Sequence, residues 1–186
     1  MAAAGGLGDD AGLAGLREVL AALGAMAPRL VSRRMLSTSD VDKRRKRLQI
    51  PRGRSEPGGG NGDASALSVF LTLEERFCVG EGHGIEVPVY DRFGRRFDMM
   101  LRRIQANRPG SYRFLGNGWW RFATANRLEE GMAVAKGRGR ELEAEVWAFR
   151  SPELLPERRA EAADHHPDDG ALGIAILIKI SDKARA

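Results

Sequence analysis

Five consecutive cationic side chains, Lys43 to Arg47, lie between a polar stretch and a short apolar segment that ends in Ile50 and Pro51. Lys and Arg neutralise phosphates, and Arg can also donate two hydrogen bonds to guanine in the major groove. The run is therefore a candidate DNA-binding arm, and it also qualifies as a nuclear-import signal. The alternative is a solvated surface, the usual role of a charge run. The candidate DNA-binding residues of this segment are Ser37, Thr38, Ser39, Lys43, Arg44, Arg45, Lys46 and Arg47.

The five cations cannot all face one groove. In an extended strand Arg45 and Arg47 would point to one side, and Arg44 and Lys46 to the other. We therefore expect two or three of them at DNA.

Local roles compete with DNA binding at both ends of this segment. Arg47 can instead pair with Asp40 or Asp42, and the hydroxyls of residues 37–39 can form a local turn with Asp40 rather than bind phosphate. The residues alone leave these alternatives open.

The charge distribution favours a polyanionic partner, with nucleic acid ahead of an acidic membrane. The chain has 186 residues, enough for one compact domain with flanks, and a formal net charge of +5. Between Arg33 and Arg54 there are nine Lys or Arg residues and two acidic residues. Between Arg92 and Arg121 there are eight Lys or Arg residues and one acidic residue. Two basic segments with a neutral one between them suggest two arms of one surface.

Signals for other function classes are weak. The single cysteine, Cys78, excludes an internal disulfide and a Cys-based zinc site, and its apolar neighbours predict a buried, inert thiol. His165 and His166 lie among acids but without ligand spacing, and neither glycine-rich stretch has the phosphate-loop pattern. We expect no enzyme, no metal and no cofactor.

No apolar run reaches the roughly 18 residues of a membrane span, and the N-terminus does not have the pattern of a secretory signal.

Composition divides the chain into segments. Residues 1–32 form an Ala/Gly-rich leader, either disordered or helical over about 12–25, where Leu13, Leu16, Leu20 and Leu23 recur at helical spacing. Such a helix is a possible protein-binding segment. Residues 54–63 are expected to be a flexible loop, 151–170 an acidic linker, and 171–186 a last strand and tail.

Most of residues 33–150 has the alternation of β-strands. Strands are expected at 85–90, 95–104, 111–115, 141–150 and 173–180, with a turn at Asp91 to Gly94 joining the first two. Pro88 predicts an edge strand or a bulge. Helices are expected from Leu73, with Thr72 and Glu75 at capping-box spacing, and from Asn117, which could cap its own helix. Many short strands with few helices predict a barrel-like or sandwich fold.

Aromatic residues near the second basic segment are assigned to the core rather than to base stacking. Trp119 and Phe122 share a helix face, and Tyr112 and Phe114 alternate with Arg113. For Trp120 both roles, core packing and base stacking, stay open.

These motifs together resemble the plant B3 DNA-binding domain. The order "LSTSDVDKRRKRLQIP", "FLTLEE", "GIEVPVYDRFGRRFDMMLRR", "SYRFLGNGWWRFATANRLEEGM" and "VWAFR" is that of the family, closest to a divergent branch long described as of unknown function. The resemblance covers about residues 33–150. It implies a mostly β fold, a seven-stranded open pseudobarrel with two short helices.

The resemblance also implies a function. Two arms would read the major groove of double-stranded DNA, as expected of a sequence-preferring transcription regulator in the nucleus. The first arm is Ser37 to Arg47 and the second is Asn107 to Arg113, with Asn107, Arg108, Ser111 and Arg113 as its candidate residues. Departures such as the loop "EPGGGNG", the second tryptophan and the lengthened hairpin "AKGRGRE" leave a rival, a B3 fold that binds proteins instead. A second rival is a DNA-cleaving enzyme, because similar pseudobarrels serve as recognition domains in some restriction enzymes.

Overall fold

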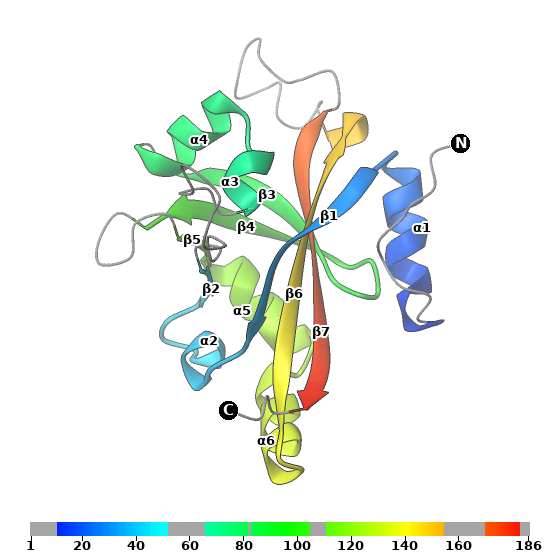
Figure 1. Cartoon of the computed structure of the whole chain (residues 1–186), viewed down its shortest axis with the longest axis vertical. Helices are drawn as coiled ribbons and strands as arrows, with labels where there is room; N and C mark the ends of the chain where they lie inside the picture. Colours follow the sequence, from blue (N-terminus) through cyan, green and yellow to red (C-terminus); the bar gives the residue numbers. More distant parts are fainter. Residues whose placement is uncertain (1–10, 52–65, 82, 105–110, 155–169, 183–186) are drawn as a thin grey trace, which may run out of the picture.

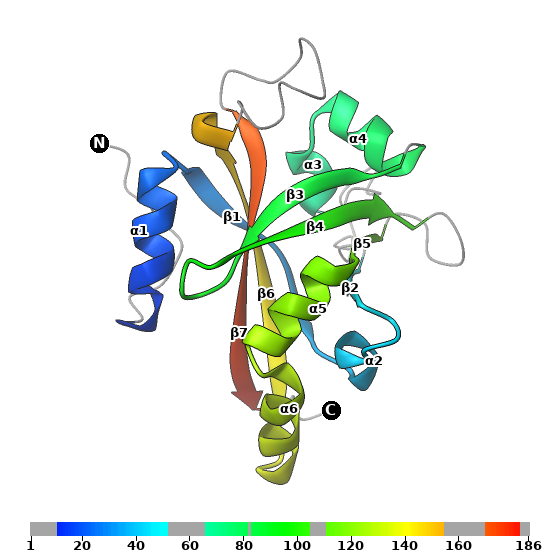
Figure 2. The same cartoon turned by 180° about the vertical axis from the view of Figure 1, so that it is seen from behind.

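The computed structural model describes residues 11–51, 66–81, 83–104, 111–154 and 170–182. Seven strands form one sheet in the order β1-β6-β7-β3-β4-β5-β2, curled into a nearly closed barrel whose two end strands are β1 and β2 (Figure 1 and Figure 2). The strands are β1 (Met26–Met35), β2 (Arg47–Ile50), β3 (Ile85–Tyr90), β4 (Arg96–Arg103), β5 (Tyr112–Leu115), β6 (Arg140–Ser151) and β7 (Ala171–Asp182). The helices are α1 (Ala14–Ala22), α2 (Thr38–Val41), α3 (Ala66–Phe70), α4 (Leu73–Gly80), α5 (Asn117–Ala125) and α6 (Leu128–Gly137), with 3-10 turns η1 (Ala11–Leu13) and η2 (Pro152–Leu154).

The mostly β, seven-stranded open pseudobarrel is confirmed, with more short helices in the described residues than the two expected. All strand pairs are antiparallel except β3 with β7. Pro88 does not mark an edge strand, because β3 lies between β4 and β7. Its missing N–H is tolerated since the pairing of β3 with β7 covers only Val89 and Tyr90.

About every second side chain of a strand points into the barrel interior, as the alternation of apolar and polar residues predicts. Trp119 and Phe122 of α5 fill one side of it, both 0% exposed and stacked with ring centroids 5.4 Å apart. Phe114 and Tyr112 are buried in the same core. These aromatic residues are therefore unavailable for base stacking, whereas Trp120 is half-buried.

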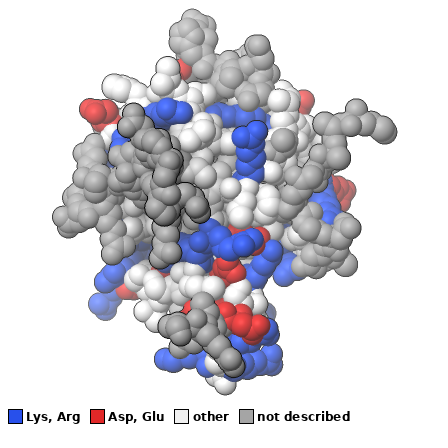
Figure 3. Space-filling model, in the orientation of Figure 1, with Lys and Arg blue, Asp and Glu red and all other residues white. Residues whose placement is uncertain are grey.

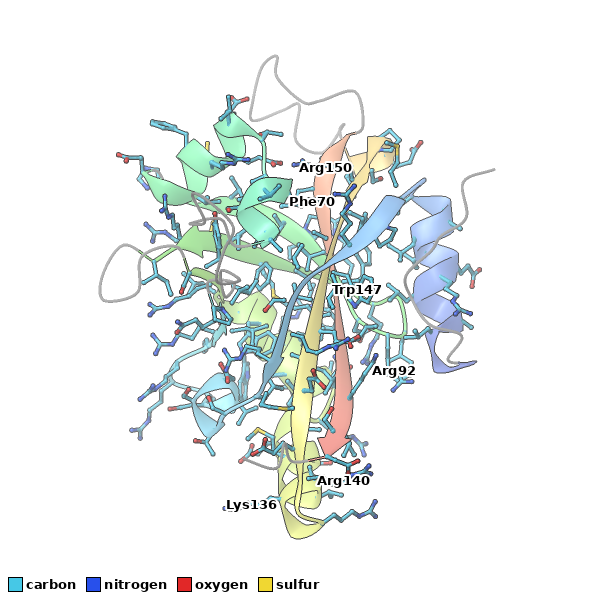
Figure 4. All side chains as sticks on the ribbon, in the orientation of Figure 1. Phe70, Arg92, Lys136, Arg140, Trp147 and Arg150 are labelled. Carbon is cyan, nitrogen blue, oxygen red and sulfur yellow. The ribbon has the colours of Figure 1, made fainter. Side chains whose placement is uncertain are left out.

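A second apolar cluster lies outside the barrel, under α1. Leu16 and Leu20 of α1 pack with Trp147 and Phe149, which are on the opposite face of β6 from the barrel core. Figure 4 shows Trp147 on the side of the sheet where α1 lies. The apolar face of this helix is thus covered by the barrel of the same chain. Cys78 in α4 is half-buried rather than buried.

The barrel includes segments outside the expected 33–150 domain. β1 begins at Met26 because it pairs along most of β6. β7, the expected last strand, is an interior strand of the sheet between β6 and β3. Residues 54–63 and most of the 151–170 segment lie outside the described residues. None of the helices in the described ranges is long and apolar enough to cross a membrane.

A buried ion pair ties α4 to β6. Arg150 donates to both carboxylate oxygens of Glu75, at 2.9 and 2.7 Å, and to the carbonyl of Phe70 at 2.7 Å. Glu75 also completes the predicted capping box with Thr72. Figure 4 shows Arg150 beside Phe70, and the guanidinium carbon is 5.5 Å from the ring centroid. Since both charges are fully paired, this contact fixes the helix on the barrel.

A buried carboxylate on β6 makes the fold sensitive to acid. Glu145, 3% exposed, accepts from Arg33 at 2.8 Å and pairs with Lys179 at 2.8 Å. Burial raises the pKa of Glu145, but the hydrogen bonds and charges of Lys179 and Arg33 outweigh it, so the pKa lies below its usual range. Its stabilisation is therefore present above the unfolded-state pKa and is lost as pH falls through the lower folded-state pKa.

We expect Glu145→Gln to lower the free energy of unfolding by about 1–2 kcal/mol at neutral pH, because charged hydrogen bonds to two cations are lost. The difference from the parent should shrink as the pH falls through the acid range. Thermal melts of both proteins between about pH 3 and 7 measure this. A difference that stays constant with pH would contradict the assignment.

Candidate nucleic-acid interface

Both candidate arms are attached to one short strand pair. β2 and β5 are antiparallel, with Arg47 opposite Leu115 and Ile50 opposite Tyr112. The first arm enters β2 at Arg47, whereas the second arm, Asn107 to Arg113, enters β5 at Tyr112, at the other end of the strand pair. The bases of the arms are thus three residue steps apart, about 10 Å.

The first arm begins with a helical turn. Ser37 is the N-cap of α2, and its hydroxyl contacts Asp40 at 2.7 Å and Ser39 at 2.8 Å. The local-turn alternative therefore describes Ser37 and Ser39 in this structure. Thr38 is exposed on the surface of α2.

The cations that follow α2 are in a turn, not in an extended strand. Asp42 accepts from the backbone N–H of Arg44 at 2.8 Å, and Lys46 has a positive φ of 41°. The predicted alternation of Arg45 and Arg47 against Arg44 and Lys46 is therefore wrong, because strand geometry starts only at Arg47. Within this turn Lys43, Arg44 and Arg45 are exposed.

Lys46 has a partner within the protein. Its ammonium donates to the side-chain oxygen of Asn117 at 2.8 Å, and its carbonyl accepts from Gly116 N–H at 3.1 Å. Asn117 is the first residue of α5, and Gly116, with φ 94°, is its N-cap. Asn117 does not cap the helix as expected; it connects α5 to the first arm instead.

Asp40 anchors the first arm to the barrel. Its carboxylate, in a residue 4% exposed, accepts from Arg34 at 2.5 Å and from Ser37 N–H at 2.7 Å. Arg34 also donates to the carbonyl of Gln49 at 2.5 Å, so it links the two end strands of the open barrel. The carbonyl of Asp40 accepts from Trp119 Nε1 at 2.7 Å. The first arm is therefore bound to β1 through Arg34 and to α5 through Trp119.

Asp40 and Asp42 do not pair with Arg47. Asp40 pairs with Arg34, and Asp42 lies 3.7 Å from Arg45. Because both carboxylates pair with other residues, neither of them holds Arg47, which is on the outer face of the sheet.

A polar row crosses the sheet between the arms. Gln49, Arg113 and Arg102 are register partners on β2, β5 and β4, and they alternate with the buried residues of these strands. Arg47 is two residues from Gln49 on the same face. Gln49 and Arg102 were not among the expected site residues. The alternation of apolar and polar residues in "RLQI" and "MLRR" predicts that both side chains point away from the core. Only the strand register shows that they are the neighbours of Arg113.

The positive charge of Arg113 is not paired with a carboxylate from the ranges that the structure describes. Burial, and then the positive charge of Arg47, lower the pKa of the Arg113 guanidinium. Its Nε is buried and has no hydrogen-bond partner within the described part of the chain. Two neighbouring cations on one face form a site suited to an anion or to the acceptor edge of a base.

The second arm is described only at its base. Ile104 N–H donates to the carbonyl of Ser111 at 2.8 Å, which closes the loop between β4 and β5. Ser111 is 3% exposed, so its side chain lies at the base of the arm rather than on its surface. Asn107 and Arg108 lie outside the described residues.

A hollow of about 860 Å³ adjoins the first arm, between α2, α6 and the start of β6. Its apolar lining includes Leu36, Val41, Met132 and Leu142, with Trp120 at one side. Figure 3 shows Lys and Arg side chains at the lower left and along the bottom of this face, where Figure 1 places α2 and α6. No group of three or more potential metal ligands occurs within the described ranges.

A family model matches most of the chain. The family described as B3 domain-containing protein At2g31720-like matches residues 12–157, which take in α1 and β1 as well as both arms. No curated protein sequence matches the chain. The matched range starts well before residue 33, in agreement with the packing of α1 and β1 on the barrel.

Proposed function

Because the chain belongs to the At2g31720-like family of B3 domain-containing proteins, whose domain is a DNA-binding type, we propose that it binds double-stranded DNA with a sequence preference, through two basic arms in the major groove. In the cell this activity would serve transcription regulation in the nucleus, and the run Lys43 to Arg47 would also serve import. No cofactor enters this function.

The observation that carries the proposal is the geometry of β2 and β5. The arm bases are about 10 Å apart, and the major groove is about 12 Å wide. The uncompensated Arg113 and the neighbouring Arg47 lie on the strands between them. A duplex held by the arms would therefore present its base edges or phosphates to these two cations, which form no ion pair within the described part of the chain.

The environment of each residue indicates which kind of DNA contact, to phosphate or to a base, it is suited to make. Lys43 and Arg44 are exposed at the tip of the first arm and suit phosphate contacts. Arg113 is on a strand whose backbone pairs with β2 and with β4, so its side chain starts from a fixed position, as a base contact requires. Lys46 holds the arm to α5 and contributes less to DNA directly.

We expect the double substitution Lys43→Ala and Arg44→Ala to weaken duplex binding on the order of 100-fold at low salt, because two phosphate contacts are lost. The slope of log affinity against log salt should become shallower by about 2. Fluorescence anisotropy with a labelled duplex from a randomised pool measures both quantities.

The matched control is Arg17→Ala with Arg29→Ala, which removes the same charge from α1 and β1. Figure 1 and Figure 2 place α1 on the side opposite α2. Equal effects of the two double variants would mean that only net charge matters. A parent chain that binds no duplex at about 50 mM salt would refute the proposed function.

A further inference from the structure

The turn between α6 and β6 carries cations that the two-arm scheme does not use. Lys136 is in the last turn of α6, Arg138 follows the helix, and Arg140 begins β6. All three are exposed. They belong to the stretch "AKGRGRE", which is not the lengthened hairpin expected from the sequence, because it joins helix α6 to strand β6.

This turn lies beside the first arm. α2 and α6 contact each other, and the hollow between them is lined by Lys43 of the arm and by Lys136. Figure 4 shows Lys136 at the bottom of the molecule, on the left of α6, which is the side on which Figure 1 places α2. The tip of the arm and the end of α6 therefore present cations to a shared surface.

Two of the three cations are available for a ligand. Arg140 pairs with Asp182, with 2.7 Å between Nε and Oδ1. Lys136 and Arg138 have no ion pair or side-chain hydrogen bond to any residue in the described ranges. Lys136 also complements the negative end of the α6 dipole, but this effect does not use up its hydrogen-bond donors.

Three carboxylates line the same hollow and limit where an anion can bind. Asp42 is engaged by the arm turn at the Arg44 N–H. Glu129 is seven residues before Lys136, about 10 Å along α6. Glu141 is half-buried on β6. The outer end of the turn, at Lys136 and Arg138, is therefore the place for a phosphate, rather than the floor of the hollow.

We propose that Lys136 and Arg138 form a third contact to DNA, with backbone phosphates that flank the site held by the two arms, on the side of the first arm. The inference rests on the proposed function and extends its footprint. Duplex DNA carries a negative charge about every 1.7 Å along its axis, so backbone that leaves the arms continues as a polyanion past neighbouring cations. The contact adds affinity and carries no base preference.

The test compares Lys136→Ala with Arg138→Ala against the control pair Arg17→Ala with Arg29→Ala. Each is titrated by anisotropy with the selected duplex, over a range of salt, on probes shortened from one end or from the other. We expect the turn variant to lose about 1–2 units of salt slope and to keep the base preference of the parent. The parent should lose affinity when one flank is removed, and the turn variant should be insensitive to that removal.

The outcomes separate the two proposals. If the turn variant matches the control in slope, or still loses affinity on removal of that flank, the third contact is refuted while two-arm binding stands. If the parent binds no duplex, both proposals fail. A changed base preference in the turn variant would also refute the inference, because phosphate contacts carry none.

Discussion

Replacing Arg113 by Gln is expected to weaken binding to the preferred duplex by about 5- to 150-fold, since a paired contact to guanine is worth about 1–3 kcal/mol. The loss should be confined to one position of the site, where the variant accepts other bases. Stability should not fall, because the guanidinium has an unused buried Nε and lies near the charge of Arg47. Removing it relieves repulsion in the free protein. The substitution is therefore expected to weaken DNA binding without lowering the stability of the fold.

The measurements are duplex selection and anisotropy for binding, and thermal unfolding for stability. Arg29→Gln on β1 is the control, since it removes one charge at a distance from the arms. A uniform loss over all duplexes, equal to that of the control, would contradict base contact by Arg113. A lowered unfolding midpoint would instead show that Arg113 supports the fold.

Replacing Asp40 by Ala is expected to lower stability by about 3 kcal/mol, because a largely buried Arg34 loses its ion pair. The N-cap of α2 loses its carboxylate partner at the same time. The first arm should then lose its fixed position, and affinity for the preferred duplex should fall by about tenfold or more even at temperatures where the barrel is folded. Protection of the amide hydrogens of α2 against exchange reports the arm directly.

Asp42→Ala is the matched control, because it removes the same charge from the same arm. The Asp42 side chain is 38% exposed, and its ion pair with Arg45 is long at 3.7 Å. We expect a stability change within about 0.5 kcal/mol. Equal affinities of the two variants would show that charge, and not the position of the arm, governs binding.

Much of the barrel could be predicted because its signals are local. In β3 and β4 the alternation of apolar residues and the turn after Asp91 specify a hairpin within about twenty residues of chain. The side chain of Asp91 holds this turn, as it accepts from the N–H of Phe93 at 2.9 Å and of Arg95 at 3.0 Å. The capping box of α4 and the helical face of Trp119 and Phe122 are local in the same sense.

The place of α1 could not be predicted in this way. Its leucines indicate a helix with one apolar face, but they do not say what covers that face. The cover is supplied by Trp147 and Phe149, some 130 residues away, on the face of β6 that a half-exposed strand would give to water. A strand buried on both faces has a weaker alternation, so the pattern in "EVWAFR" did not reveal it.

The amino-acid sequence by itself determined the strand-rich class, the two basic segments and the family to which they belong, because these depend on composition, periodicity and the order of short motifs. Only the tertiary structure decided what each cation can do. Arg34 and Lys46 hold the first arm, and the buried Nε of Arg113 has no hydrogen-bond partner among the described residues. The physical reason is that the availability of a charge depends on neighbours brought together by strand register and by barrel closure, and these neighbours are distant in the chain.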